Sequence, residues 1–131
     1  RLAVAHAGWR GLAAGILARA VAALGDAPFA AWIGPAICGQ CYEVDAPVVE
    51  ALRALGPWVA QAVRNGRRAG HYTVDLGAIA AEQLKRLGAQ SVIPSGLCTW
   101  ENGLWYSHRR DGPRTGRFAT LAALQPQSEY P

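Results

Sequence analysis

Short apolar runs alternate along the chain with longer stretches in which apolar residues recur every three or four positions. Such runs predict β-strands, and such stretches predict amphipathic helices. The strands are expected at residues 2–7, 29–33, 72–74 and 91–93. The helices are expected at residues 12–24, 45–55, 58–63 and 76–87. Asp45 and Asp75 stand where N-caps are expected, and Gly25 and Gly88 stand where helices end.

The last part of the chain has the pattern of a β-hairpin. Residues 104–110 and 118–124 favour strands, and the Gly- and Pro-containing segment 111–116 between them favours a turn. The polar tail, residues 125–131, is expected to be loose. Because strands and helices alternate before a closing hairpin, we expect a mixed α/β fold in a single domain over residues 1–131.

Composition narrows the class of protein. The chain has 131 residues, of which 51% are hydrophobic and 17% charged, so a disordered or linker protein is excluded. No apolar run reaches the roughly 18 residues of a spanning helix, and no secretory cleavage pattern follows the N-terminus. Three cysteines are too few for a disulfide scaffold, so we expect reduced thiols and a cytoplasmic location. The sequence contains no methionine and opens directly on an apolar run, from which we expect a piece lacking its N-terminal portion.

The basic charge says little about partners. The net charge is +4, but Lys85 is the only lysine, and abundant arginine together with abundant alanine is typical of a GC-rich coding sequence. Two local arginine clusters remain as candidates for binding phosphate groups. They comprise Arg64, Arg67 and Arg68 in one segment, and Arg109, Arg110, Arg114 and Arg117 in the other.

The segment His6–Gly11, HAGWRG, is the first candidate for chemistry. An apolar run delivers His6 to a Gly-x-x-Gly turn that leads into a helix, where free N–H groups favour an anion. Neutral imidazole is also a common ligand of zinc and copper. The alternative is a histidine hydrogen-bonded in the core, with Arg10 as an ordinary surface cation. The segment is not a P-loop, since the Gly-Lys-Ser/Thr sequence is missing.

The second candidate is Cys38-Gly39-Gln40-Cys41, in a loop predicted over residues 36–44. Such a pair can be redox-active or can supply half of a zinc site. Cys98 would be a third ligand, and a Cys₃His site would take its fourth ligand from His6, His71 or His108. Because no second ligand pair has matching spacing, the pattern favours thiols that lie idle in a turn.

The third candidate is the C-terminal run in which Trp105 and Tyr106 precede several arginines. Aromatic rings and guanidinium groups together can bind bases and phosphates, as in a nucleic-acid-binding module. Alternate residues of a strand face opposite sides, however, so the two rings would be divided between the faces. A hairpin with one buried side is therefore favoured over a continuous stacking surface.

Three blocks in this order carry a family resemblance. They are HAGWRG at residues 6–11, then Ile33–Ile37 with Cys41–Val44, and then Cys98-Thr99 with Ser107–Asp111 and Thr115–Arg117. The chain resembles the C-terminal part of the YfiH-like family, also called the laccase-domain or polyphenol oxidase family, over residues 2–124. The resemblance implies an α/β/β/α sandwich. The chain departs from the pattern at His108, where the family usually has tyrosine.

The resemblance also implies an activity. Family members are zinc-dependent enzymes that cleave adenosine, inosine or methylthioadenosine with phosphate and deaminate adenosine, and copper-dependent polyphenol oxidation is also ascribed to them. Their metal is held by two histidines and a cysteine. His6 matches one histidine and is the expected metal-binding and catalytic residue. The other two ligands belong to upstream segments that this sequence does not contain, and none of the three cysteines matches them.

The expected partners are thus a purine nucleoside and phosphate, with no membrane and no nucleic acid. Charge and position assign phosphate binding to four residues, Arg10, Arg109, Arg110 and Arg117. One ligand of three cannot hold a metal firmly, so we expect this chain by itself to bind zinc weakly and to be a poor catalyst. Two alternatives from other classes are a basic nucleic-acid-binding module and a cysteine-based hydrolase or redox enzyme that uses Cys38 and Cys41.

Overall fold

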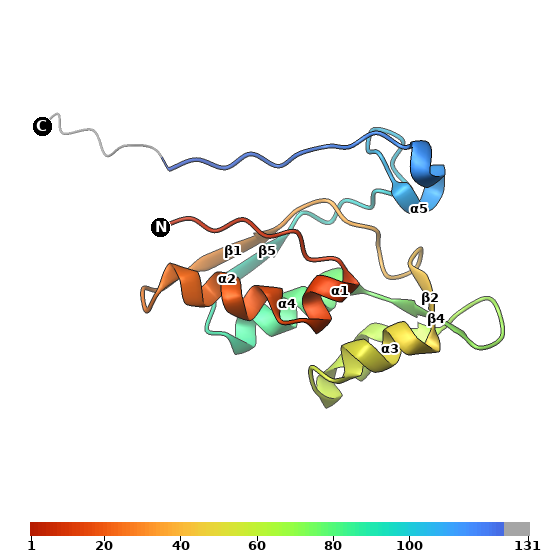
Figure 1. Cartoon of the computed structure of the whole chain (residues 1–131), viewed down its shortest axis with the longest axis horizontal. Coiled ribbons are helices and arrows are strands. Elements are labelled where there is room, and N and C mark those ends of the chain that lie inside the picture. Colours follow the sequence, from red (N-terminus) through yellow and green to blue (C-terminus); the bar gives the residue numbers. More distant parts are fainter. Residues whose placement is uncertain (125–131) are drawn as a thin grey trace, which may run out of the picture.

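Two small sheets form the strand framework of the computed structural model, which describes residues 1–124 (Figure 1). In the first sheet, β1 (Ala30–Ile33) pairs in parallel with β5 (Ser91–Pro94). In the second, β4 (His71–Val74) lies between β2 (Glu43–Asp45) and β3 (Val63–Asn65), and both pairings are antiparallel. A parallel pair needs a long crossover, and the intervening chain provides it with the second sheet and three helical segments. The mixed α/β class is confirmed.

The first helical stretch divides into two helices, α1 (Trp9–Ala13) and α2 (Ile16–Leu24). The sequence predicts one helix over residues 12–24, and this prediction is wrong in its continuity. Gly15 adopts a left-handed conformation with φ 77°, which interrupts the helix and which glycine tolerates because it lacks a Cβ. Gly25 ends α2 at φ 78°, as predicted.

Both helices predicted to follow an aspartate cap begin where the sequence predicts. α3 (Ala46–Arg53) starts after Asp45, and α4 (Leu76–Arg86) starts after Asp75. The segment η1 (Pro57–Ala62) is a 3₁₀ helix in the place of the helix expected over residues 58–63. α4 covers the β1–β5 sheet and contacts α2, while α3 packs on the second sheet and on α1.

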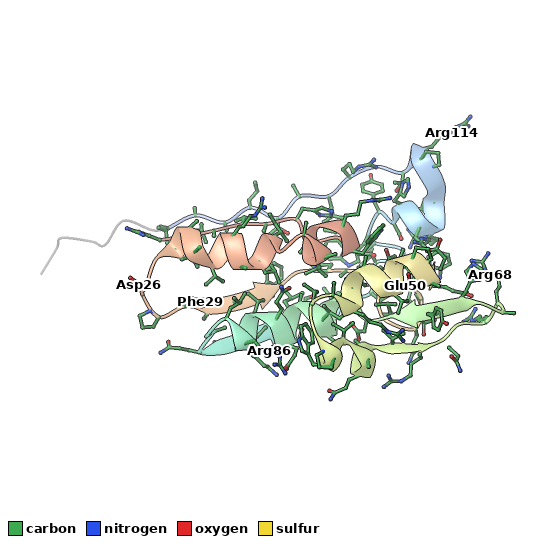
Figure 2. All side chains as sticks on the ribbon, turned by 60° about the horizontal axis from the view of Figure 1, so that its bottom comes forward. Asp26, Phe29, Glu50, Arg68, Arg86 and Arg114 are labelled. Atoms are coloured by element: carbon green, nitrogen blue, oxygen red, sulfur yellow. The ribbon has the colours of Figure 1, made fainter. Side chains whose placement is uncertain are left out.

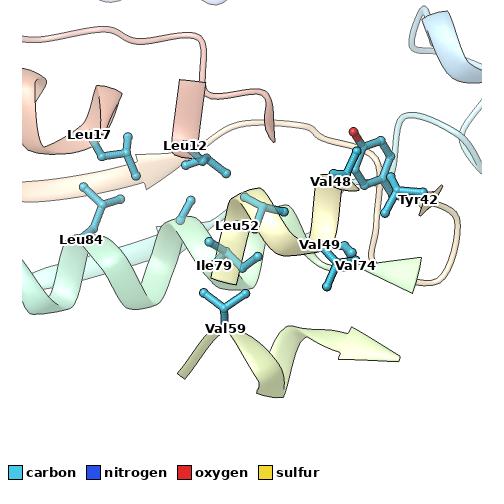
Figure 3. Packing of buried hydrophobic residues seen from close by; sticks show 12 residues of the cluster. Leu12, Leu17, Tyr42, Val48, Val49, Leu52, Val59, Val74, Ile79 and Leu84 are labelled. Atoms are coloured by element: carbon cyan, nitrogen blue, oxygen red, sulfur yellow. The ribbon is translucent and has the colours of Figure 1, made fainter. Parts of the chain in front are cut away.

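A continuous apolar cluster joins the helices to the sheets (Figure 3). Its fully buried side chains come from α1, α3, η1, β4 and α4, so every one of these elements has its apolar face in the same core. The largest of them are Leu12, Val49, Leu52, Val59, Val74 and Ile79. Tyr42 lies at one end of the cluster, beside Val48.

The predicted strand over residues 2–7 is absent. This segment is not in a sheet, and Leu2 and Val4 expose 46% and 65% of their surface. An apolar run becomes a strand only where a sheet edge accepts its N–H and C=O groups. Within residues 1–124, no strand pairs with it.

The predicted C-terminal hairpin is also wrong. Residues 108–111 form a short helix, α5 (His108–Asp111), followed by the 3₁₀ turn η2 (Gly112–Arg114), and residues 115–124 form no strand. The Asp111 carboxylate accepts the Ser107 N–H at 3.1 Å, and the Asp111 N–H donates to the Ser107 carbonyl at 2.7 Å. These bonds close a turn where the hairpin strand was expected. The tail predicted to be loose, residues 125–131, lies outside the described residues. No helix among the described residues is long and apolar enough to cross a membrane.

Candidate functional site

Two of the four arginines assigned to phosphate bring positive charge to the environment of Tyr42, one of them directly over its ring. The Arg109 guanidinium carbon is 4.7 Å from the centre of the Tyr42 ring, and Arg109 donates a hydrogen bond to the Glu43 carbonyl. The Arg10 guanidinium carbon lies 4.4 Å from the centre of the Trp9 ring, and the positive charge of Arg10 acts to lower the pKa of the Tyr42 hydroxyl. Arg10 comes from α1, Tyr42 from the loop before β2, and Arg109 from α5. The fold therefore joins residues from two of the blocks that carry the family resemblance, and the charge of Arg10 from the first block acts on the same tyrosine.

Tyr42 is the buried member of this group, with 7% of its surface exposed. Burial raises the pKa of its hydroxyl overall, while the positive charges of Arg109 and Arg10 act in the opposite direction. The hydroxyl is consequently protonated at neutral pH and remains a hydrogen-bond donor. Both arginine side chains are exposed, so an anion approaching from solvent can reach their guanidinium groups.

His6 lies in the exposed segment before α1. Its Nε2 atom lies 3.4 Å from the position that a Cβ on Gly8 would occupy, so the glycine keeps open the space beside that nitrogen. No other candidate ligand groups with His6 among residues 1–124. The described residues therefore do not by themselves fit the zinc site that the family resemblance implies, because they supply one nitrogen ligand where three ligands are expected.

Arg110 is engaged inside the protein. Its guanidinium group donates to the Asp111 carboxylate at 2.7 and 2.9 Å. It also donates to four backbone carbonyls, those of Thr99, Trp100, Asn102 and Trp105. This pairing raises the pKa of Arg110 and, together with the Ser107 N–H, lowers the pKa of Asp111. Arg110 thus holds the loop of residues 99–105 against α5.

The other arginines named from the sequence lie elsewhere. Arg117 donates to the carbonyls of Thr115 and Gly116 in its own segment. Arg68 lies at the outer end of the β3–β4 hairpin, and Arg114 lies at the outer end of the segment that follows α5 (Figure 2). Because the C-terminal hairpin does not form, its strands offer no aromatic and arginine surface of the kind a nucleic-acid-binding module would use.

The three cysteines form a second cluster. Their sulfur atoms all lie within 4.8 Å of one another, and all three thiols are free and partly buried. This is the one group of three or more candidate metal ligands in the described part of the chain, and it contains no histidine. The fold therefore does not bring His6, His71 or His108 to the three cysteines, and no Cys₃His set forms among the described residues.

The environments of these thiols differ. The Cys98 sulfur accepts the backbone N–H of Cys38 at 3.3 Å, and the Cys41 sulfur lies 3.6 Å from Oε1 of Glu101. Burial raises the pKa of Cys41 to about 12, with further increases from Cys38, Cys98 and Glu101. Burial also raises the pKa of Cys98, but backbone N–H groups around its sulfur outweigh this and lower the pKa overall.

Sequence reasoning missed Tyr42 and Glu101. Tyr42 stands within a block that carries the resemblance, but nothing in its local pattern shows that Arg109 lies over its ring. Glu101 is an isolated carboxylate in the sequence, and only the return of the chain past Cys41 gives it a partner.

The fold and these groups define a mixed α/β protein in which Arg109 lies over a buried tyrosine beside a cluster of three thiols. The chain matches the family described as multi-copper polyphenol oxidoreductase laccase over residues 1–125, and it belongs to that family. It is 48% identical over 128 residues to a purine nucleoside phosphorylase of Xylella fastidiosa (strain 9a5c), covering 92% of this chain and 48% of that protein. It is 37% identical over 127 residues to the purine nucleoside phosphorylase YfiH of Escherichia coli (strain K12), covering 94% of this chain and 51% of that protein.

Solved structures support the same assignment. A Neisseria meningitidis protein superposes with a TM-score of 0.75 at 38% identity, over 82% of this chain and 46% of that one. The YfiH protein of Bacillus licheniformis superposes with a TM-score of 0.76 at 35% identity, over 82% and 44%. These likenesses confirm the predicted family and its fold. The chain spans about half the length of the curated relatives it matches.

Proposed function

We propose that this chain supplies the phosphate-binding part of a cytoplasmic purine nucleoside phosphorylase. The observation that carries the proposal is the position of Arg109 4.7 Å from the centre of the Tyr42 ring, where the positive charge of Arg10 from a separate element also acts on the Tyr42 hydroxyl. Relatives that carry the name purine nucleoside phosphorylase support it. The nucleosides implied by the resemblance are adenosine, inosine and methylthioadenosine.

In this reaction a phosphate oxygen bonds to C1′ of the ribose while the bond between C1′ and the purine nitrogen breaks. The bonding electrons leave with the base, which then takes up a proton. Arg10 and Arg109 bind the phosphate by charge-assisted hydrogen bonds and orient it toward C1′. The neutral Tyr42 hydroxyl donates a third hydrogen bond to a phosphate oxygen, which its raised pKa allows.

Arg110 acts in this proposal as a positioning residue. It holds residues 99–105 and the start of α5 together, and Arg109 is its neighbour on that helix. Arg117 remains a candidate for a further phosphate contact from the segment that follows η2. His6 is proposed as one ligand of a zinc ion, with copper as the alternative metal. Because the described residues give that ion no second ligand, we assign no step of the reaction to it.

The test is a phosphorolysis assay on the complete gene product that contains this chain, with release of the purine base measured against phosphate concentration. A hydrogen bond to a charged group contributes about 1.5–3 kcal/mol, so Arg10→Ala and Arg109→Ala should each raise the KM for phosphate by about 10-fold or more. Arg19→Ala, an exposed arginine on α2, is the matched control and should leave that KM unchanged. An unchanged phosphate KM in both site variants would refute the proposed phosphate site.

The same preparations test the remaining implied activities. Conversion of adenosine to inosine without phosphate would show deamination, and oxidation of a catechol after copper loading would show polyphenol oxidase activity. His6→Ala should lower the zinc content of the complete gene product by about one equivalent, as expected when one of three ligands is lost. Full zinc content in His6→Ala would remove His6 from the metal site.

A further inference from the structure

The cysteine cluster joins two segments that are far apart in the sequence. Cys38 and Cys41 lie in the loop between β1 and β2, whereas Cys98 follows β5. Backbone hydrogen bonds hold these segments side by side, from the Ala36 N–H to the Leu97 carbonyl at 3.2 Å and from the Thr99 N–H to the Ala36 carbonyl at 3.0 Å. The sulfur atoms are therefore placed by the sheet framework.

The turn that carries two of the thiols is also fixed. The N–H groups of Cys41 and Tyr42 both donate to the Cys38 carbonyl at 3.0 Å, which closes the turn and turns both sulfurs to one side. A Cβ on Gly39 would lie 2.7 Å from Cβ of Asp75, so the turn packs directly against the start of α4. Only a residue without a side chain permits this close approach.

We propose that Cys38, Cys41 and Cys98 bind one zinc ion that clamps the loop after β1 to the loop after β5, with Glu101 as the fourth ligand. In a tetrahedral zinc site with Zn–S bonds of about 2.3 Å, sulfur atoms lie about 3.8 Å apart, which is compatible with a cluster whose sulfurs are all within 4.8 Å. The N–H bond from Cys38 to the Cys98 sulfur is of the kind that supports a metal-bound thiolate.

Glu101 has the geometry of a ligand toward one of the thiols. With a Zn–O bond of about 2.1 Å, a carboxylate oxygen and a sulfur on the same tetrahedral ion lie about 3.6 Å apart. The distance between Oε1 of Glu101 and the Cys41 sulfur is 3.6 Å. The Glu101 carboxylate is not within 4.8 Å of all three sulfur atoms. Its side chain is exposed, and in the proposed site it rotates to take the fourth ligand position. Binding releases the thiol protons to the solvent and involves no redox step.

The clamp shares no residue with the proposed phosphate site or with His6, although Cys41 directly precedes Tyr42. It fixes Thr99 and Trp100, whose carbonyls accept hydrogen bonds from Arg110. Soft thiolate ligands select zinc or copper(I) over magnesium or calcium, and the tetrahedral set with one oxygen favours zinc.

The experiment measures metal binding by the full chain carrying His6→Ala, so that the metal ligand proposed at His6 cannot contribute. The protein is reduced, stripped with a chelator, and titrated with Co²⁺ as a spectroscopic substitute and with Zn²⁺. We expect one equivalent of each metal, thiolate-to-cobalt charge-transfer absorption with tetrahedral d–d bands, and a rise in Tm of about 10 °C at free zinc near 100 times Kd.

Single substitutions in the same background identify the ligands. Cys98→Ser and Cys41→Ser should each weaken zinc binding by more than about 100-fold, and Glu101→Gln by about 10-fold or more. Glu50→Gln, an exposed acid on α3, is the matched control and should bind as the parent does. Circular dichroism shows whether each variant folds. Because Cys41 and Cys98 are replaced separately, one folded variant is enough to test whether the cysteines bind the metal.

Three results would overturn the proposal. Cobalt spectra without thiolate charge transfer would exclude the cysteines as ligands. Parental affinity in a folded Cys98→Ser variant would reduce the site to the Cys38–Cys41 pair. A disulfide between any two of the three cysteines, found by mass spectrometry in protein purified under reducing conditions, would show that the cluster serves thiol chemistry in place of metal binding.

Discussion

Asp75 and Asp45 occupy the same position relative to their helices, yet only one caps its helix with its side chain. Oδ1 of Asp75 accepts the Ala78 N–H at 2.8 Å at the start of α4. Asp45 makes no such bond at the start of α3. Replacing Asp75 by alanine removes one acceptor and leaves a helix N–H without its partner, while the Cβ that packs against Gly39 is kept.

The expected loss of stability follows from the free energy that N-cap side chains contribute to helices. Loss of an aspartate cap costs about 1 kcal/mol, within a range of about 0.5–2 kcal/mol. An unfolding entropy of about 2.1 cal/mol/K per residue gives about 0.28 kcal/mol/K for 131 residues. Asp75→Ala should therefore lower Tm by about 4 °C and reduce the free energy of unfolding in urea by about 1 kcal/mol.

The assay is urea unfolding followed by circular dichroism, together with a thermal scan. Asp75→Asn, which keeps a side-chain oxygen, should recover most of the loss. Asp45→Ala is the matched control and should change the free energy of unfolding by less than about 0.5 kcal/mol. Equal losses in Asp45→Ala and Asp75→Ala would refute the assignment of capping to one aspartate alone.

Three further predictions concern the core, the cysteine turn and acid pH. Leu52→Ala should cost about 2–5 kcal/mol in urea unfolding because the side chain is 0% exposed, whereas Leu104→Ala, at 90% exposure, should cost little. Gly39→Ala should cost about 1–3 kcal/mol because its Cβ meets Asp75, and Gly103→Ala, with no atom within 4 Å, should be tolerated. The pKa of Asp111 is lowered, so the stability that its carboxylate contributes is present above the ordinary aspartate pKa and is lost as pH falls through the lowered value. The chemical shift of the Ser107 amide should titrate with a midpoint below about 3.9, and a midpoint at or above that value would contradict the prediction.

The candidate site was only partly predictable. His6, Arg10 and Arg109 follow from motifs, since each belongs to a block that resembles the family. Their positions relative to one another do not follow from motifs, because a sequence block does not show which distant residue it contacts in the fold. Tyr42 stands close in sequence to neither arginine, and Arg109 lies over its ring only because the fold brings α5 to the loop before β2.

The sequence does not distinguish the role of Arg110 from that of Arg109. In the sequence it is equivalent to Arg109, one more cation in a basic run. In the fold its guanidinium group faces inward to four carbonyls and Asp111, while Arg109 remains exposed over Tyr42. Consecutive residues of a helix point about 100° apart. Arg109 and Arg110 are neighbours on α5, so they face different surroundings and take different roles.

Local pattern by itself determined the elements whose stability is local. α4 has the right bounds because its apolar period, its Asp75 cap and its stop at Gly88 all act within a few residues. β1 and β5 were likewise evident as short apolar runs. The tertiary structure decided the rest: that residues 2–7 form no strand, that the C-terminal hairpin gives way to α5, and that Cys98 meets Cys38 and Cys41. The reason is physical. A strand or a cluster exists only where another segment supplies its hydrogen bonds or ligands, and for β1 and for Cys38 that segment lies about 60 residues away along this chain.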